Sequence, residues 1–234
     1  MPKVSVIMSV YNGEKYLEEA TESILNQSFR DFEFIIINDG SIDKTQEILE
    51  GFQRRDKRIR VVSRANKGLI YSLNEGVKMA QGEYIVRMDA DDVSRPKRLE
   101  KQLKYAQDNG LMICGSWAEG ADSQGKKVRD MNYPPDTGKI RTYALLHNPF
   151  IHPSVMFRKD VFEKVGGYRQ FFKHIEDYEL WTRIVFKYKT GNIPEILLNY
   201  RFHGEQITNK NNLVMRLKGI LVRILALYRF LFRF

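Results

Sequence analysis

Short apolar runs alternate with segments of helical periodicity through the first half of this sequence, and the alternation constrains the fold more than any other feature. The runs typical of β-strands lie at Val4–Val10, Phe32–Asn38, Ile59–Val62, Glu83–Met88 and Leu111–Gly115. The segments typical of α-helices lie between them, at Lys15–Gln27, Lys44–Arg55, Gly68–Ala80 and Pro96–Asn109. This order predicts an α/β fold, a mostly parallel sheet flanked by helices on both faces.

Polar loops follow three of the predicted strands. They are Tyr11-Asn12-Gly13, Asp39-Gly40-Ser41 and Asp89-Ala90-Asp91. Because ligands bind beyond the carboxyl ends of the strands in parallel sheets, we expect the three loops to share one ligand-binding edge.

The third loop belongs to the acidic sequence Met88-Asp89-Ala90-Asp91-Asp92, which ends an apolar run. Bare carboxylates at the end of a buried strand are costly, so solvent, a basic partner or a cation must satisfy them. Alternate residues of an extended segment point the same way, so Asp89 and Asp91 can converge on Mg²⁺ or Mn²⁺. From this peptide alone an alternative stands equally well, in which Asp91 and Asp92 cap the helix expected near Pro96.

The composition indicates a globular protein. The 234 residues are 43% apolar and 29% charged, which suits one domain with two lobes. The single cysteine, Cys114, excludes an intramolecular disulfide and fits a reducing compartment. The apolar run at Val4–Val10 is too short for a signal peptide, so we expect a cytoplasmic protein.

The positive charge is concentrated at the C-terminal end. The formal net charge is +9, and seven Lys or Arg against one Glu place about +6 of it in residues 201–234. This distribution argues against a nucleic-acid-binding domain and for a specialised C-terminal segment, residues 205–234.

The segment Leu213–Phe234 has the pattern of an amphipathic helix. Leucines and isoleucines fill one half of its helical wheel. Five basic residues fall in the other half: Arg216, Lys218, Arg223, Arg229 and Arg233. Central arginines make a membrane-spanning helix costly, so the pattern predicts a helix lying in the plane of an anionic membrane. The alternative is a helix that docks on the protein's own core or on a partner subunit.

Eight short motifs, in order over roughly residues 3–204, resemble those of the inverting family-two glycosyltransferases. They are Val4–Asn12, Ile37–Thr45, Asn66–Leu69, Ala80–Tyr84, Asp89–Asp92, Gly166–Tyr168, Glu176-Asp177 and Tyr200–His203. The resemblance implies a GT-A fold, a Rossmann-like nucleotide-binding sheet, over residues 1–204. Within it, residues 1–117 would bind the nucleotide-sugar and residues 118–204 the acceptor. One departure is Ser9, where many members have proline.

The resemblance also implies residue roles on the donor side. Asp91 would bind the divalent cation directly, Asp89 would be shared between cation and ribose, and His203 would complete the metal or diphosphate site. In addition to Asp89, five residues would contact the nucleotide-sugar: Ser9, Tyr11, Asp39, Gly68 and Arg201. Ordinary alternatives remain open, with Asp39-Gly40 as a plain turn, Tyr11 as a lid on the core and Gly68 as a helix start.

On the acceptor side, inversion at the anomeric carbon requires one base to deprotonate the attacking hydroxyl. The resemblance points to Asp177 as this base, and Glu176 can hold it or raise its pKa by like-charge repulsion. Alternatively, both acids merely favour the first turn of a helix.

Together these features predict a metal-dependent inverting glycosyltransferase, attached peripherally to the inner face of the cell membrane. It would move a hexosyl or N-acetylhexosaminyl group from a nucleotide-diphosphate sugar, a UDP-sugar by family habit, to a saccharide or lipid-linked acceptor in surface-polysaccharide biosynthesis. An inactive membrane-associated scaffold of the same fold is the alternative. An aspartate-nucleophile phosphatase is disfavoured, because the Asp-x-Asp motif follows the fourth predicted strand instead of the first.

Overall fold

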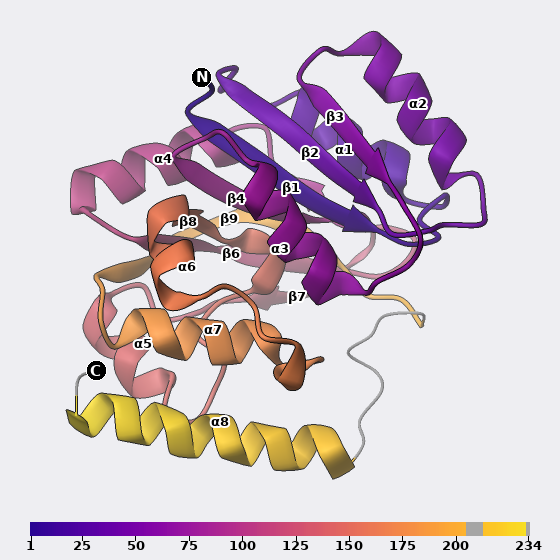
Figure 1. Cartoon of the computed structure of the whole chain (residues 1–234). Helices are drawn as coiled ribbons and strands as arrows, with labels where there is room; N and C mark the ends of the chain where they lie inside the picture. The colour runs from indigo at the N-terminus through magenta and orange to yellow at the C-terminus, as the bar shows by residue number, and fades with distance from the viewer. Residues whose placement is uncertain (205–212, 233–234) are drawn as a thin grey trace.

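The computed structural model describes residues 1–204 and 213–232, which form one mixed β-sheet flanked by helices (Figure 1). The strands in chain order are β1 Val4–Val10, β2 Phe32–Asn38, β3 Ile59–Ser63, β4 Tyr84–Asp89, β5 Val93–Ser94, β6 Ile113–Ala121, β7 Lys127–Met131, β8 Met156–Arg158 and β9 Thr190–Arg201. The α-helices are α1 Leu17–Leu25, α2 Thr45–Arg55, α3 Leu69–Met79, α4 Arg98–Asn109, α5 Thr137–Tyr143, α6 Lys159–Val165, α7 Glu176–Val185 and α8 Leu213–Phe232. Two short 3-10 turns, η1 His152–Ser154 and η2 Gln170–Phe172, complete the described elements.

The first half folds as its pattern predicts. Strands β1 to β4 pair in parallel, in the order β3-β2-β1-β4, with α1, α2 and α3 as crossovers. The register aligns Ser9 with Ile37 on one neighbour and with Asp89 on the other. The carboxyl ends of β1, β2 and β4 therefore meet at one edge, as the three polar loops indicated.

The second half makes the sheet mixed. Strand β8 runs antiparallel to both β4 and β6, while β9 runs parallel to β6 and antiparallel to β5. The β5–β9 pairing brings the end of β9 beside the acidic loop that follows β4. Helix α5 was not predicted from the sequence.

The sheet is buried on both faces. In β1, Val6 and Met8 belong to one apolar cluster while Ile7 belongs to the other. The first cluster includes side chains of α1, α2 and α4, and the second includes α3, α6 and α7 around the fully buried Trp181. Strands buried on both faces read as continuous apolar runs, which is why β1 and β2 were readily predicted.

Helix α8 lies along α7, on the side away from the sheet (Figure 1). Val222 and Ala226 are fully buried there, and Arg229 forms an ion pair with the buried Glu179 of α7 at 3.1 Å. The half of the helical wheel that carries the basic residues therefore faces the protein. The segment 205–212 and Arg233 lie outside the described residues.

The other half of α8 is apolar and exposed. Ten of its large apolar side chains are exposed: Leu213, Val214, Leu217, Ile220, Ile224, Leu227, Tyr228, Phe230, Leu231 and Phe232. No helix among the described residues has both the length and the apolar character that crossing a membrane requires. The helix therefore docks on the protein, as the alternative predicted, and it also presents an apolar face outward.

Candidate active site

The carboxylates of Asp89, Asp91 and Asp92 converge at the carboxyl end of β4. One ligand atom from each lies within 4.8 Å of the others. Asp89 and Asp91 are half-buried and Asp92 is buried, with 1% of its surface exposed. The two side chains predicted to converge therefore do so, and Asp92 joins them.

Asp92 was not expected among the ligating residues. Its Oδ1 accepts a hydrogen bond from the Arg201 backbone N–H at 2.9 Å, while its buried Oδ2 has no hydrogen-bond partner in the described structure. Helix α4 begins at Arg98 and has no side-chain cap, so Asp91 and Asp92 do not cap it. With helix capping excluded, the interpretation that remains is that the acidic sequence forms a cation-binding site.

The end of β9 closes this cluster from the other side. The His203 Nε2 atom lies 2.8 Å from Oδ2 of Asp91. The Arg201 Nε atom donates to the Asp91 carbonyl at 2.9 Å, and its Nη2 donates to Glu19 at 2.5 Å. The structure therefore brings together Arg201, the last residue of β9, and His203, two residues beyond it, and the Arg201 guanidinium positions the acidic loop.

Burial raises the pKa of Asp92 well above its ordinary value, and the charges of Asp91 and Asp89 raise it further. Burial likewise raises the pKa of Asp89, although an ion pair with the buried Arg87 opposes the shift. Burial and mutual repulsion therefore disfavour the charged forms of Asp89 and Asp92, although Arg87 pairs with Asp89. Hard oxygen donors clustered this closely, one of them an orphaned buried oxygen, fit a divalent cation such as Mg²⁺ or Mn²⁺.

Arg87 was missed by sequence reasoning, because a charged residue inside an apolar strand carries no motif. Its side chain is 5% exposed, and its Nε has no hydrogen-bond partner among the described residues. The positive charge of Arg87 lowers the pKa of Asp89 and also that of Asp177. Arg87 is therefore close enough to both the acidic cluster and the predicted base to act on their charges.

Glu176 and Asp177 open α7 and face the same region. Burial raises the pKa of Glu176 to about 7, and the charge of Asp177 adds to the shift. Burial also raises the pKa of Asp177, but hydrogen bonds from the Tyr178 N–H at 2.7 Å and from Asn148 Nδ2 at 2.6 Å oppose it. The charge of Asp177 in turn raises the pKa of Asp89, so the two predicted centres are electrostatically coupled.

The predicted nucleotide-side residues line the neighbouring strand ends. Tyr11 is 53% exposed and so does not cover the core. Asp39 is buried and accepts hydrogen bonds from the N–H groups of Lys67 and Gly68 at 2.8 and 2.9 Å, with Arg64 as an ion-pair partner. Gly68, at φ +88°, is the residue directly before α3. The alternative interpretation of Gly68 as a helix start is therefore confirmed.

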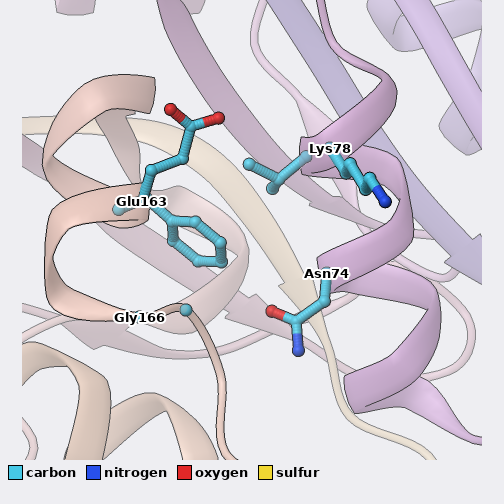
Figure 2. Close-up of a pocket in the computed structure, with 7 residues that line it drawn as sticks. Asn74, Lys78, Glu163 and Gly166 are labelled. Carbon is cyan, nitrogen blue, oxygen red and sulfur yellow. The ribbon is translucent and has the colours of Figure 1, made fainter.

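A surface pocket lies elsewhere, between α3 and α6 (Figure 2). It has a volume of about 290 Å³ and includes Asn74, Lys78 and Glu163 in its lining. Asn74 exchanges two hydrogen bonds with the backbone of Tyr168, at 2.9 and 3.0 Å, and so ties α3 to the segment that follows α6. None of the predicted site residues lines this pocket, so it is not the donor site.

Comparison with known proteins decides the family. The family model described as glycosyl transferase family 2 matches residues 5–166. The chain belongs to this family. Among its relatives, the O-antigen biosynthesis glycosyltransferase WbnJ of Escherichia coli is 38% identical over 206 residues, which cover 86% of this chain and 80% of WbnJ. The amylovoran biosynthesis glycosyltransferase AmsE of Erwinia amylovora is 32% identical over 211 residues, covering 88% of this chain and 78% of AmsE.

Solved structures show the same fold for this family 2 chain. TarS residues 1–349 of S. aureus, solved with UDP-GlcNAc, superpose with a TM-score of 0.78 at 20% identity, covering 99% of this chain and 72% of that one. The mannosyltransferase PcManGT of Pyrobaculum calidifontis, solved with GDP-Man and Mn²⁺, gives 0.69 at 17% identity, covering 97% and 64%. The GT-A fold predicted from the motifs is confirmed.

Proposed function

We propose that this family 2 member is a metal-dependent inverting glycosyltransferase of surface-polysaccharide biosynthesis. The observation that carries the proposal is the arrangement at the sheet edge: three carboxylates converge there, and the charge of the buried Arg87 acts on this cluster and on one pair of acids, Glu176 and Asp177. The names of WbnJ and AmsE support polysaccharide biosynthesis as the pathway class.

Asp91 and Asp89, with Asp92 and His203 beside them, would hold the cation. When bound, a divalent cation supplies Lewis-acid stabilisation of the departing diphosphate. The unpartnered Oδ2 of Asp92 supports this assignment, because a buried carboxylate oxygen without a partner is costly unless a ligand satisfies it.

Asp177 would accept the proton from the acceptor hydroxyl as that oxygen attacks the anomeric carbon from the face opposite the leaving group. A pKa of about 7 leaves Glu176 substantially protonated near neutral pH. A neutral Glu176 allows the negative charge of the pair to reside on Asp177, where Asn148 and the Tyr178 N–H stabilise it. Two adjacent acids thereby take different protonation states.

The donor would be a nucleotide-diphosphate sugar, with UDP as the first choice because TarS was solved with UDP and with UDP-GlcNAc. The exposed ring of Tyr11 is free to stack on the base, beside Ser9 at the end of β1. Asp39 would act partly by fixing the backbone of Lys67 and Gly68, which forms the wall of the nucleotide site. Arg201 would hold the acidic loop next to the diphosphate.

We also propose that the exposed apolar half of α8 docks peripherally on a membrane, which suits a lipid-linked acceptor. Leu217, Ile220 and Ile224 are each at least 51% exposed on that half. Arg229 is paired with Glu179 and so is removed from lipid contact, which leaves Arg216 and Arg223 to meet anionic headgroups at the flank.

The deciding experiment is a thermal-shift panel of UDP, GDP, dTDP and CMP, each with Mn²⁺ or with EDTA. Wild type is compared with Asp91→Asn and with Asp108→Asn, an exposed acid at the end of α4, as the matched control. We expect one nucleotide to stabilise wild type and Asp108→Asn only with Mn²⁺, by about 3 kcal/mol at a hundredfold excess over Kd. A folded wild type that shows no metal-dependent shift with any nucleotide would favour the inactive-scaffold alternative.

A further inference from the structure

Arg98 begins α4 and is fully buried, and the proposed reaction gives it no role. A buried arginine normally pairs with a carboxylate, because an isolated buried charge is costly. Here the groups that accept hydrogen bonds from its guanidinium are all neutral. Burial lowers the pKa of Arg98 to about 9, and among the nearby charges that of Asp92 opposes this shift most strongly. Apolar packing alone does not explain an arginine at this position.

The guanidinium of Arg98 joins the two ends of the segment 87–94, which carries the three converging carboxylates. On the β4 side, Nη2 donates to the Arg87 carbonyl at 2.9 Å, and Nη1 lies 3.5 Å from the Met88 sulfur. On the β5 side, Nη1 donates to Ser94 Oγ at 2.9 Å. The Ser94 hydroxyl in turn donates to the Met88 sulfur at 3.3 Å, so the two ends also contact each other. One planar side chain therefore fixes the positions of the residues that precede and follow the carboxylates.

Gln102, one turn further along α4, holds the guanidinium in place. Its Oε1 accepts a hydrogen bond from Arg98 Nε at 2.9 Å. Its Nε2 donates to the Cys114 carbonyl of β6 at 3.0 Å and to the Ser154 carbonyl of η1 at 2.8 Å. Gln102 is itself fully buried, and hydrogen bonds are electrostatically stronger in the protein interior than in water. Arg98 is thereby anchored to two elements of the second half of the fold.

The carboxylates benefit from such support because like charges repel one another. One ligand atom from each of the three lies within 4.8 Å of the others. A segment whose two ends are already fixed loses less conformational freedom when its carboxylates close on a cation. The direction of each donor matters for this purpose, and a guanidinium holds its donors in one rigid plane, whereas the ammonium group of a lysine does not.

We propose that Arg98 is a positioning residue for the metal site, which holds both ends of the segment 87–94 so that its three carboxylates converge on one cation. This inference rests on the proposed metal-dependent reaction and adds a residue that acts through the backbone and Ser94. Its function depends on the set of directed hydrogen bonds and not on positive charge alone. Arg98 differs in this from Arg87, whose guanidinium pairs with the Asp89 carboxylate itself.

The test measures the Mn²⁺ concentration that gives half of the nucleotide-dependent thermal shift, with the nucleotide that the thermal-shift panel selects. Arg98→Met removes the guanidinium, and Arg98→Lys keeps the charge without the directed hydrogen bonds. We expect both variants to require about 10- to 100-fold more Mn²⁺ than wild type and to recover the full shift at saturating Mn²⁺. A merely structural role would lower the melting temperature without ligand and leave the Mn²⁺ requirement unchanged.

The matched control is Arg183→Met, which removes another buried arginine. Arg183 pairs with Glu179 within α7 and donates to the Gly167 carbonyl at 2.5 Å, so its loss affects the fold and not the segment 87–94. We expect Arg183→Met to lower the melting temperature without ligand and to keep the Mn²⁺ requirement of wild type.

Ser94→Ala decides the question if the Arg98 variants fail to fold. It removes one acceptor of the guanidinium at the expense of a single oxygen atom, so we expect a folded protein that requires about 3- to 10-fold more Mn²⁺. Ser5→Ala is its control, because Ser5 is an equally buried serine at the amino end of β1, at the opposite edge of the sheet. Ser5→Ala should keep the Mn²⁺ requirement of wild type.

Three results overturn the proposal. The first is a wild-type Mn²⁺ requirement in folded Arg98→Met or in Ser94→Ala. The second is a wild-type requirement in Arg98→Lys, which would show that the charge suffices. The third is an equal increase in Arg183→Met, which would attribute the effect to lost stability. Failure of the proposed function shows separately, as the absence of any Mn²⁺-dependent shift in wild type, and this inference then fails with it.

Discussion

The Nε2 atom of His203 lies 2.8 Å from Oδ2 of Asp91, although 112 residues separate the two in the chain. The β5–β9 pairing produces this contact, because it aligns Val93, just after the acidic sequence, with Asn199. A histidine fixed against a ligating carboxylate either joins the ligands or orients one of them, and both functions affect metal affinity.

We therefore expect His203→Ala to raise the Mn²⁺ concentration needed for the UDP thermal shift by about 10- to 100-fold. The shift at saturating Mn²⁺ should return to the wild-type value, since the nucleotide contacts are intact. His147→Ala removes an exposed imidazole elsewhere and serves as the control. An unchanged Mn²⁺ requirement in His203→Ala would remove His203 from the metal site.

Asp177→Asn tests the base. The variant keeps the shape of the side chain, and Asn148 can still pair with it, so we expect a folded protein that binds UDP and Mn²⁺ normally. Loss of general-base catalysis should lower the transfer rate by about 10²- to 10⁴-fold. The measurement is transfer from the nucleotide-sugar that the thermal-shift panel selects, and near-native rates in a folded variant would show that the base is another group.

Glu176 makes folding stability depend on pH. Burial raises its folded-state pKa to about 7, above the ordinary value of 4.5 for a glutamate. The folded state therefore keeps its proton while the unfolded state loses it, and stability falls as pH rises from about 4.5 to 7. At about 1.4 kcal/mol per unit, the loss is about 3 kcal/mol.

Glu176→Gln cannot ionise and should flatten this dependence. We expect the free energy of unfolding of Glu176→Gln to exceed that of wild type by up to about 3 kcal/mol at pH 8 and to match it near pH 4. Urea unfolding at both pH values measures the difference. Glu195→Gln, at an exposed acid of β9, is the control and should leave the pH dependence of wild type unchanged. Equal stabilities of Glu176→Gln and wild type at pH 8 would mean that Glu176 titrates normally.

The parts of this architecture that sequence could predict are those that local pattern encodes. Strands β1 and β2 match their predicted bounds because each is a continuous apolar run. The metal-side and base-side motifs are likewise local and short, and the roles that they suggest for individual residues stay predictions.

The parts that sequence could not predict depend on contacts between distant segments. Arg87 lies in an apolar strand and becomes a site residue only because the fold brings Asp177 of α7 within reach of its charge. Asp92 differs from its neighbours because the end of β9 covers it, where the Arg201 N–H donates to its carboxylate. Asn148 is a site residue because the chain after α5 reaches Asp177 at the start of α7. The orientation of α8 is a further case, since a helical wheel divides the faces but does not tell which one the protein covers.

That orientation leads to the membrane prediction. Because the basic half packs on α7 and the apolar half is exposed, docking on lipid should depend mainly on apolar side chains. We expect Ile220→Glu combined with Ile224→Glu to abolish cosedimentation with phosphatidylglycerol vesicles, as truncation after Asn212 should, because both remove the exposed apolar surface. Arg216→Glu, one exposed charge on the flank, should weaken it by only about 1 kcal/mol.

Circular dichroism and the UDP thermal shift establish that each variant is folded. Vesicle binding that survives in the truncated chain would place the membrane contact outside α8. Binding lost in Arg216→Glu but kept in the double glutamate variant would show that α8 meets the headgroups through charge, and that its exposed apolar half is covered by a protein partner instead.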